Sequence, residues 1–137
     1  MANELVLVYE TQSPIDFIIA SATAVEKGAI LKLANPFTVS TTAGDHDIIA
    51  GVAAEEHIAN SGVTKISVYR GGVFRAIAGT AGVAVGRSCD TDTATSAANK
   101  LAVCAANAEN VFGIALETAT AGESFLVELR PTTMVSA

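Results

Sequence analysis

Short apolar stretches rich in Val, Ile and Phe recur along the chain between breaks that contain Gly, Asn, Asp or Ser. This pattern is typical of all-β proteins, whose strands are short and are separated by turn-forming residues. We expect strands at Ala29–Leu33, Ile48–Ala54, Thr64–Tyr69, Val73–Ala78, Val83–Val85, Lys100–Cys104, Val111–Leu116 and Ser124–Leu129. The predicted fold class is therefore all-β, a compact small β-barrel with few or no helices.

Two of these stretches alternate in the way that half-buried strands do. Ile66 and Val68 fall on one face of the first stretch, and Phe125, Val127 and Leu129 fall on one face of the second. The paired glycines in Arg70–Val73 separate two such stretches and predict a hairpin turn, because glycine supplies the positive φ that tight hairpins need. Proline cannot donate to a strand ladder, so Pro131 is expected to end the last strand.

One segment repeats later in the chain. Ile49–Glu55 matches Val111–Glu117, with Gly51 and Gly113 at the same place and Glu55 and Glu117 at the end. Each copy leads through a small-residue turn into an alternating strand that ends near an arginine. Glycine inside a strand indicates a bend or a close backbone approach, and we expect each glutamate to mark where its strand leaves the core.

The repeat predicts two related β-modules within one domain. We assign the N-terminal arm to residues 1–14 and a single β-barrel domain to residues 15–137, with an internal pseudo-repeat at about residues 24–70 and 84–130. Ala94–Ala108 fits this pattern least well. Its many alanines favour a short helix, whereas the apolar cluster Leu101–Val103 favours a loop followed by a strand.

The arm is apolar and lies outside both modules. Leu5, Val6, Leu7, Val8 and Tyr9 precede a polar stretch that ends at Pro14. A free apolar arm is an aggregation hazard, so it either forms an edge strand of its own sheet or docks on a neighbouring protein.

Composition and charge exclude several classes of function. Half of the 137 residues are hydrophobic but only 5% are aromatic, which predicts a thin core that gains from assembly into an oligomer. Fourteen acidic residues against eight scattered cations give a net charge of −6. Because nucleic-acid binding needs clustered Lys and Arg, and anionic membranes attract the same residues, neither partner is expected. No apolar run is long enough to span a membrane.

Candidate chemistry is sparse. Asp45–Asp47, which includes His46, could place two carboxylates on one side of a strand for a metal, but the segment follows turn-forming residues and a solvated turn is the simpler interpretation. Glu55–His57 could pair carboxylates with a proton shuttle, yet no second cluster completes it. Nucleophile and phosphate-loop motifs are absent, so we expect no enzyme, no cofactor and no metal. Cys89 and Cys104 are interpreted as two reduced thiols.

Several of these segments together resemble the capsid decoration (cement) proteins of tailed bacteriophages. The resemblance is carried by the N-terminal arm and by Glu26–Leu33, Ile48–Ala53, Val68–Phe74 and Val111–Glu117, and it extends over nearly the whole chain. It implies a β-barrel or β-tulip fold that carries an extended arm and has no catalytic residues. Ala94–Ala108 departs from the family pattern.

The resemblance also implies partners and a location. Members of this family commonly form homotrimers that bind the major capsid protein on the outside of the expanded head and clamp neighbouring subunits. The arm, with Leu5, Val6, Leu7, Val8, Tyr9 and Pro14, would then bind the capsid. The protein would be made in the host cytoplasm and located on the virion. A β-rich binding module, such as a tail-associated or host-recognition protein, is the alternative.

Overall fold

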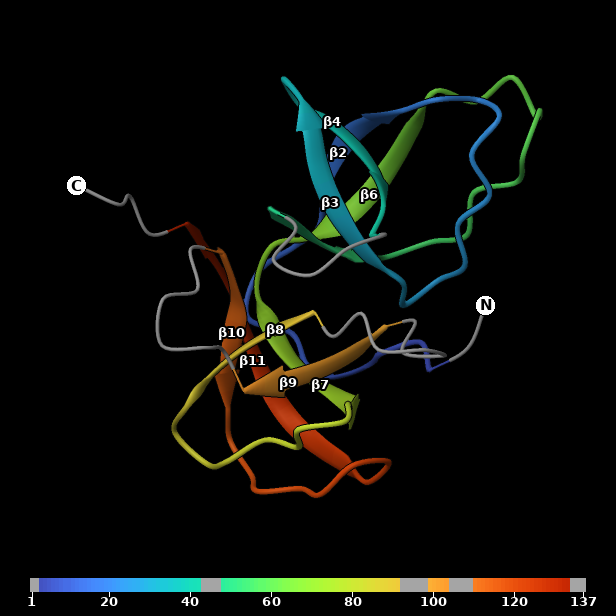
Figure 1. Ribbon diagram of the computed structural model, residues 1–137. Helices are drawn as coiled ribbons and strands as arrows, with labels where there is room; N and C mark the ends of the chain where they lie inside the picture. Colours follow the sequence, from blue (N-terminus) through green and yellow to red (C-terminus); the bar gives the residue numbers. More distant parts are fainter. Residues whose placement is uncertain (1–2, 43–47, 92–98, 104–109, 134–137) are drawn as a thin grey trace.

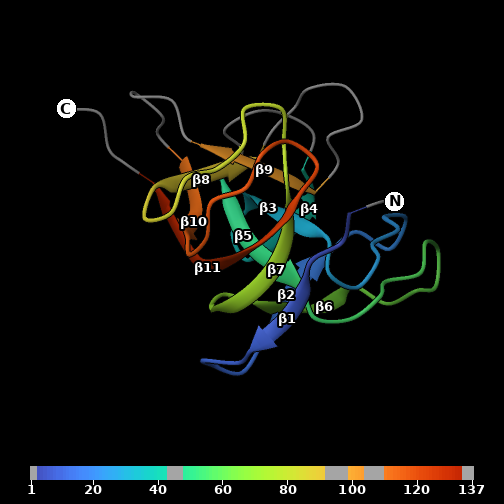
Figure 2. The same ribbon diagram turned by 90° about the horizontal axis from the view of Figure 1, so that it is seen from below.

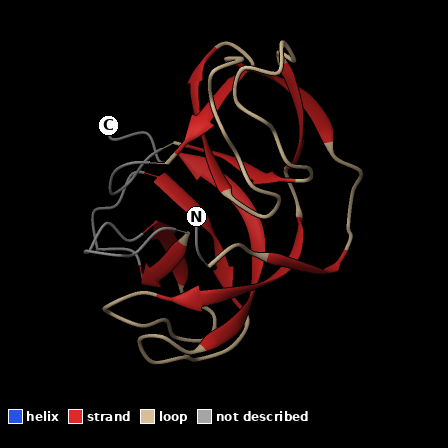
Figure 3. Ribbon diagram, turned by 90° about the vertical axis from the view of Figure 1, so that its right-hand side faces the viewer, coloured by secondary structure: helices blue, strands red, loops and turns tan. Residues whose placement is uncertain are grey.

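The computed structural model describes residues 3–42, 48–91, 99–103 and 110–133, and these residues contain strands and loops but no helix (Figure 3). The strands are β1 (Val6–Tyr9), β2 (Ile15–Ile19), β3 (Ile30–Asn35), β4 (Thr38–Thr41), β5 (Ile49–Ala53), β6 (Lys65–Tyr69), β7 (Gly72–Ala78), β8 (Ser88–Thr91), β9 (Lys100–Val103), β10 (Asn110–Ala115) and β11 (Ser124–Thr133). The predicted all-β fold class is confirmed.

The strands form two small barrels that lie next to each other (Figure 1). The first barrel closes in the order β2-β4-β3-β5-β6. The second follows the order β7-β11-β10-β8-β9 and closes through a parallel pairing of β7 with β9. Closure removes most of the open sheet edges that would otherwise invite aggregation.

The two barrels repeat the same connections. In each barrel the first strand pairs in parallel with the third and antiparallel with the fifth, as β2 does with β4 and β6, and β7 with β9 and β11. Backbone hydrogen bonds repeat as well. Val25 and His57 exchange two bonds of 2.9 and 2.8 Å, and Val83 and Ala119 exchange two of 2.9 and 3.1 Å. The two related β-modules predicted from the sequence repeat are therefore present.

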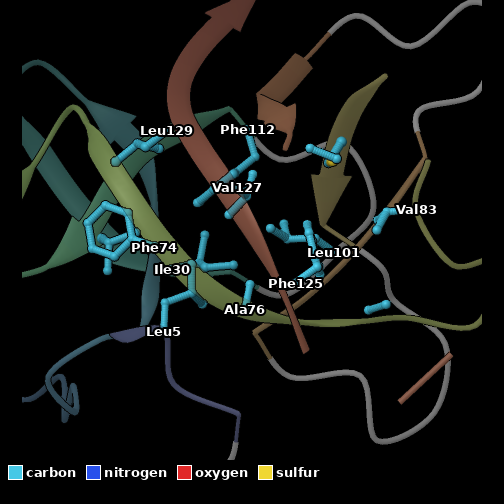
Figure 4. Close-up of a cluster of buried hydrophobic side chains, with 14 of the residues drawn as sticks. Leu5, Ile30, Phe74, Ala76, Val83, Leu101, Phe112, Phe125, Val127 and Leu129 are labelled. Carbon is cyan, nitrogen blue, oxygen red and sulfur yellow. The ribbon is translucent and has the colours of Figure 1, made fainter. Parts of the chain in front are cut away.

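Each barrel has its own core, but the second core extends into the first barrel. Phe17, Ile19 and Leu31 belong to the core inside the first barrel. The second core contains Phe74, Phe112 and Phe125 from its own strands and also residues from the first barrel and the arm, namely Ile30, Ile49, Val52 and Leu5. Figure 4 shows Leu5 and Ile30 beside Phe74 and Ala76. The barrels therefore share buried apolar surface.

A hydrogen bond and an aromatic contact reinforce this junction. The side-chain oxygen of Asn99, which precedes β9, accepts a hydrogen bond from the Ile30 amide of β3 at 2.9 Å. The rings of Tyr69 and Phe74 meet edge to face across the passage from β6 to β7, with centroids 5.7 Å apart. A buried amide without a partner is costly, so the Asn99 contact fixes how the barrels pack.

Four sequence expectations about local structure are wrong. Val83–Val85 forms no strand and contributes only an isolated bridge at Val83, while the strand lies further on, at β8. The predicted set of strands also omits β2, which follows the arm, and β4, which is rich in Thr and Ser. Arg70–Val73 is no hairpin turn, because β6 and β7 pair with other strands and not with each other. Pro131 does not end β11, which continues to Thr133 past an irregular register opposite Val111–Gly113.

Ala94–Ala108 is described only in part. Within it, residues 99–103 form the turn and strand of β9, and this part of the segment is not helical. The remaining positions of that segment lie outside the described residues, and so do Asp45, His46, Asp47 and Cys104.

Candidate functional site

The N-terminal arm forms an edge strand on the second barrel. β1 pairs antiparallel with β7, with Val6 opposite Arg75 and Leu7 opposite Phe74 (Figure 2). Alternating side chains of a strand point to opposite faces, so one face of the arm turns inward and the other outward. Of the two alternatives left by the sequence, the structure places the arm on its own sheet.

The inward face of the arm belongs to the second core. Leu5 is only 4% exposed, and Leu7 packs against the same cluster. The Leu5 amide also donates to the carbonyl oxygen of Gly28 in the first barrel at 2.8 Å. Gly28 has a φ of +91°, and a Cβ there would lie 2.4 Å from the Leu5 carbonyl oxygen, so only glycine fits. The arm thus contacts both barrels.

The outward face of the arm is an exposed apolar surface. Val6 is 62% exposed, Val8 39% and Tyr9 64%. Pro14 is half-buried and immediately precedes β2. Of the arm residues predicted to bind a partner, Leu5 is therefore buried in the protein's own core. Val6, Val8 and Tyr9, which we call the arm surface, remain accessible.

The repeated glycines sit at close approaches between backbones. A Cβ on Gly51 would lie 1.9 Å from the carbonyl oxygen of Tyr69, and one on Gly113 would lie 1.9 Å from that of Glu128. Glu55 and Glu117 are exposed just beyond the ends of β5 and β10. The two glycines allow the strands of each barrel to pack closely, and the two glutamates do not converge on a common site.

Glu55, Glu56 and His57 line a shallow pocket of about 170 Å³ together with Ile58, Ser61 and Val63. The His57 ring is buried, and its nitrogens are committed: Nδ1 lies 2.6 Å from the Thr23 carbonyl oxygen and Nε2 lies 2.7 Å from that of Val63. A ring held between two carbonyls is a structural clamp between loops and is not positioned to transfer protons to a substrate.

The rest of the chemistry is equally structural. The part of the chain that the structure describes contains no group of His, Cys, Asp and Glu able to hold a metal, and no helix able to cross a membrane. Cys89 is buried, and its Sγ lies 3.8 Å from the Arg87 carbonyl oxygen. The pKa of Glu123 is lowered because the Thr120 amide and hydroxyl both donate to its carboxylate, each at 2.8 Å.

Sequence reasoning missed several exposed apolar side chains outside the arm. Ile15 and Ile18 on β2 are 45% and 47% exposed, and Phe37 in the turn before β4 is 59% exposed with a φ of +51°. A bulky residue with positive φ is uncommon and often marks a functional position. The sequence signal for Phe37 is an aromatic residue directly after Pro36 in a tight turn, where glycine or asparagine is usual.

Comparisons with known proteins agree with this architecture. The sequence profile described as phage cement protein matches residues 9–131. Among solved structures, the chain is similar to the N base of the head fiber gp8.5 of bacteriophage phi29, with a TM-score of 0.54 and 17% identity. That match covers 90% of this chain and 98% of the phi29 chain, and at this identity it concerns the fold alone. No curated protein matches the sequence.

Proposed function

Because the chain belongs to the phage cement protein family, a family of head-associated structural proteins, we propose that it binds the outside of the phage head and stabilises the expanded capsid. In this proposal it clamps neighbouring subunits of the major capsid protein. The observation that carries the proposal is the family match over residues 9–131. The protein would be made in the host cytoplasm and added to the head after expansion.

The surface chemistry supports a binding role. The arm surface of Val6, Val8 and Tyr9 lies on an edge strand, where a partner can add backbone hydrogen bonds and receive alternate side chains. Tyrosine is enriched among the residues that dominate binding energy at protein interfaces, so Tyr9 is the side chain expected to contribute most. A net charge of −6 keeps the free protein soluble despite that apolar surface.

We further propose that the protein acts as a homotrimer. Several modest contacts made by one assembly give a stable attachment without a large interface on each copy. Light scattering of the free protein and of protein released from heads should give the mass of three chains. A single chain in both preparations would contradict this part of the proposal.

The test of capsid binding uses expanded heads assembled without this protein. The wild-type protein should sediment with the heads and raise the temperature at which they release their DNA. A variant with Val6→Ser, Val8→Ser and Tyr9→Ser should melt as the wild type does and bind the heads at least tenfold more weakly. The matched control is Val85→Ser. Val85 is 61% exposed and lies in the loop between β7 and β8, outside the arm. If the wild-type protein does not bind the heads, the proposed function is wrong.

A further inference from the structure

The two barrels differ at one equivalent position. Ile15 lies opposite Val68 in the β2–β6 pair, and Phe74 lies opposite Val127 in the β7–β11 pair. Both occupy the inward face of the first strand of their barrel, as Phe17 and Ala76 do two residues later. Phe74 is nevertheless 1% exposed, while Ile15 is 45% exposed.

The arm accounts for part of the difference, and the barrel junction, where the Tyr69 ring meets Phe74, accounts for the rest. In the second barrel, β1 lies along the edge of β7 and places Leu7 opposite Phe74. In the first barrel, β4 lies along the same edge of β2 but reaches only Ile18 and Ile19. No strand among the described residues lies beside Ile15 and Asp16 on this side. The first barrel therefore has an inward-facing aliphatic side chain without the strand that covers its counterpart.

The backbone on this edge is oriented to accept a strand. The Ile18 amide donates to the Phe37 carbonyl oxygen on this side of β2. Because successive residues of a strand turn their amide and carbonyl groups to opposite sides, Asp16 presents both groups to the same edge. Its counterpart Arg75 uses that edge to pair with Val6.

We propose that this edge of β2 binds an extended segment of the major capsid protein, which runs antiparallel to β2 as β1 runs antiparallel to β7. The segment places an aliphatic side chain over Ile15 and a basic side chain beside Asp16. This inference rests on the proposed function and adds a second contact, separate from the arm surface. The exposed side chain of Ile18 lies on the same outer face of β2 as Asp16, and the exposed Phe37 packs against Phe17 with ring centroids 5.1 Å apart.

Three observations favour a capsid segment as the occupant. The arm of the same chain already lies on β7, so it is not available for β2. Asp16 is exposed, and although the Ser67 hydroxyl on β6 donates to one of its carboxylate oxygens at 3.0 Å, its negative charge favours a basic residue on a strand at the opposite edge of β2. The eight cations of this chain are scattered, so a second copy offers no basic segment to meet Asp16 at this edge.

Two substitutions block the edge by different means. Ile15→Glu places a charge where the aliphatic contact is proposed. Asp16→Pro removes the donor, and proline is tolerated on an edge whose amide faces solvent. Each should weaken binding to expanded heads about tenfold, the loss expected for one or two intermolecular hydrogen bonds, and should leave the melting temperature near that of the wild type. The control Val85→Glu should bind as the wild type does.

The outcomes separate this inference from the proposed function. If the wild type fails to bind heads, the function itself is wrong. If the wild type binds and both variants bind equally well, only the β2 contact is wrong. If the variants instead change the oligomeric state of the free protein, the edge belongs to a second copy and the inference is also overturned.

A measurement on the unmodified protein decides the case if either variant unfolds. Hydrogen exchange of the Asp16 amide should slow on binding to heads, because the capsid segment accepts its hydrogen bond. The Ser67 amide, on the neighbouring strand of the closed barrel, serves as the internal reference. An Asp16 amide that exchanges at the same rate in the free and head-bound protein would contradict the proposal.

Discussion

The amide of Leu5 donates a hydrogen bond to the carbonyl oxygen of Gly28, and this contact ties the N-terminal arm to the first barrel while β1 pairs with the second. The Leu5 side chain lies in the core that the two barrels share. The arm is thus a structural link between the barrels on its inward face and an exposed apolar surface on its outward face.

This double role predicts different results for neighbouring arm residues. Leu5→Ala removes a buried side chain and should lower the free energy of unfolding by about 2–5 kcal/mol. Val6→Ala, one residue along, changes a side chain that is 62% exposed and should alter stability by about 0.5 kcal/mol or less. Urea denaturation of both variants measures the difference.

Deleting residues 2–13 should lower stability as well, because the deletion uncovers Phe74 and removes the Leu5 contacts. A truncated protein that melts at the wild-type temperature would contradict the structural role of the arm. It would then favour an arm that serves only to dock on the capsid.

Gly51 and Gly113 of the repeated segment, together with Gly62 in the loop between β5 and β6, predict a graded series of alanine variants. Gly113 has a close contact without a positive φ, Gly62 has a φ of +83° in open space, and Gly51 has both a close contact and a φ of +154°. We expect Gly62→Ala to cost about 1 kcal/mol and Gly113→Ala to cost about 3 kcal/mol or more. Gly51→Ala should cost at least as much as Gly113→Ala.

Thermal and urea melts of these variants give the order directly. Equal costs for Gly62→Ala and Gly113→Ala would show that the backbone around β10 and β11 relaxes to accept a side chain. The interpretation that the repeated glycine marks the same close backbone approach in each barrel would then be wrong.

The sequence predicted the class of the fold better than its details. Most strands with dense Val, Ile and Phe are predicted, because a strand buried in a barrel needs apolar residues at alternate positions, but β2 is also rich in Ile and Phe and is not predicted. Thr38–Thr41 and Ser88–Thr91 were missed because they are short and polar in composition. Cys89, Asp90 and Thr91 are nevertheless buried, because barrel closure and neighbouring strands cover them regardless of their polarity.

The candidate surfaces depend on pairing between distant strands, which local patterns do not encode. Leu5 and Val6 are both aliphatic, yet one is buried and the other exposed, because β7 fixes the register of the arm. Ile15 lies in β2, a strand that the sequence prediction omits. Its exposure becomes visible only when the two barrels are compared.

Glu123 provides a pH-dependent test. Its carboxylate accepts hydrogen bonds from the Thr120 amide and hydroxyl, and these bonds lower its pKa below the ordinary value of glutamate. The bonds therefore add stability above the ordinary pKa, and that stability is lost as the pH falls through the lowered value. Thr120→Ala removes the hydroxyl donor, so the Glu123 titration followed by NMR should move back toward higher pH. An unchanged titration would show that the backbone amide alone holds the carboxylate.

The His57 ring links two loops of the first barrel and has no counterpart in the second, so its removal should destabilise only the first barrel. The ring connects the Thr23 carbonyl, in the loop between β2 and β3, to the Val63 carbonyl, in the loop between β5 and β6. The equivalent position of the second barrel is Ala119, which keeps the backbone bridge but has no ring. His57→Ala leaves two carbonyls without these partners and should cost about 2–3 kcal/mol.

The loss should be confined to one barrel. Amides in the loops around Thr23 and Val63 should exchange faster in His57→Ala, while those around Val83 and Ala119 keep their rates, because the two loop pairs share no hydrogen bond among the described contacts. The control Ile58→Ala changes the adjacent side chain, which is 65% exposed, and should leave both regions unaffected. Faster exchange in both barrels would mean that they open together, and the clamp would then act on the whole molecule through the shared core.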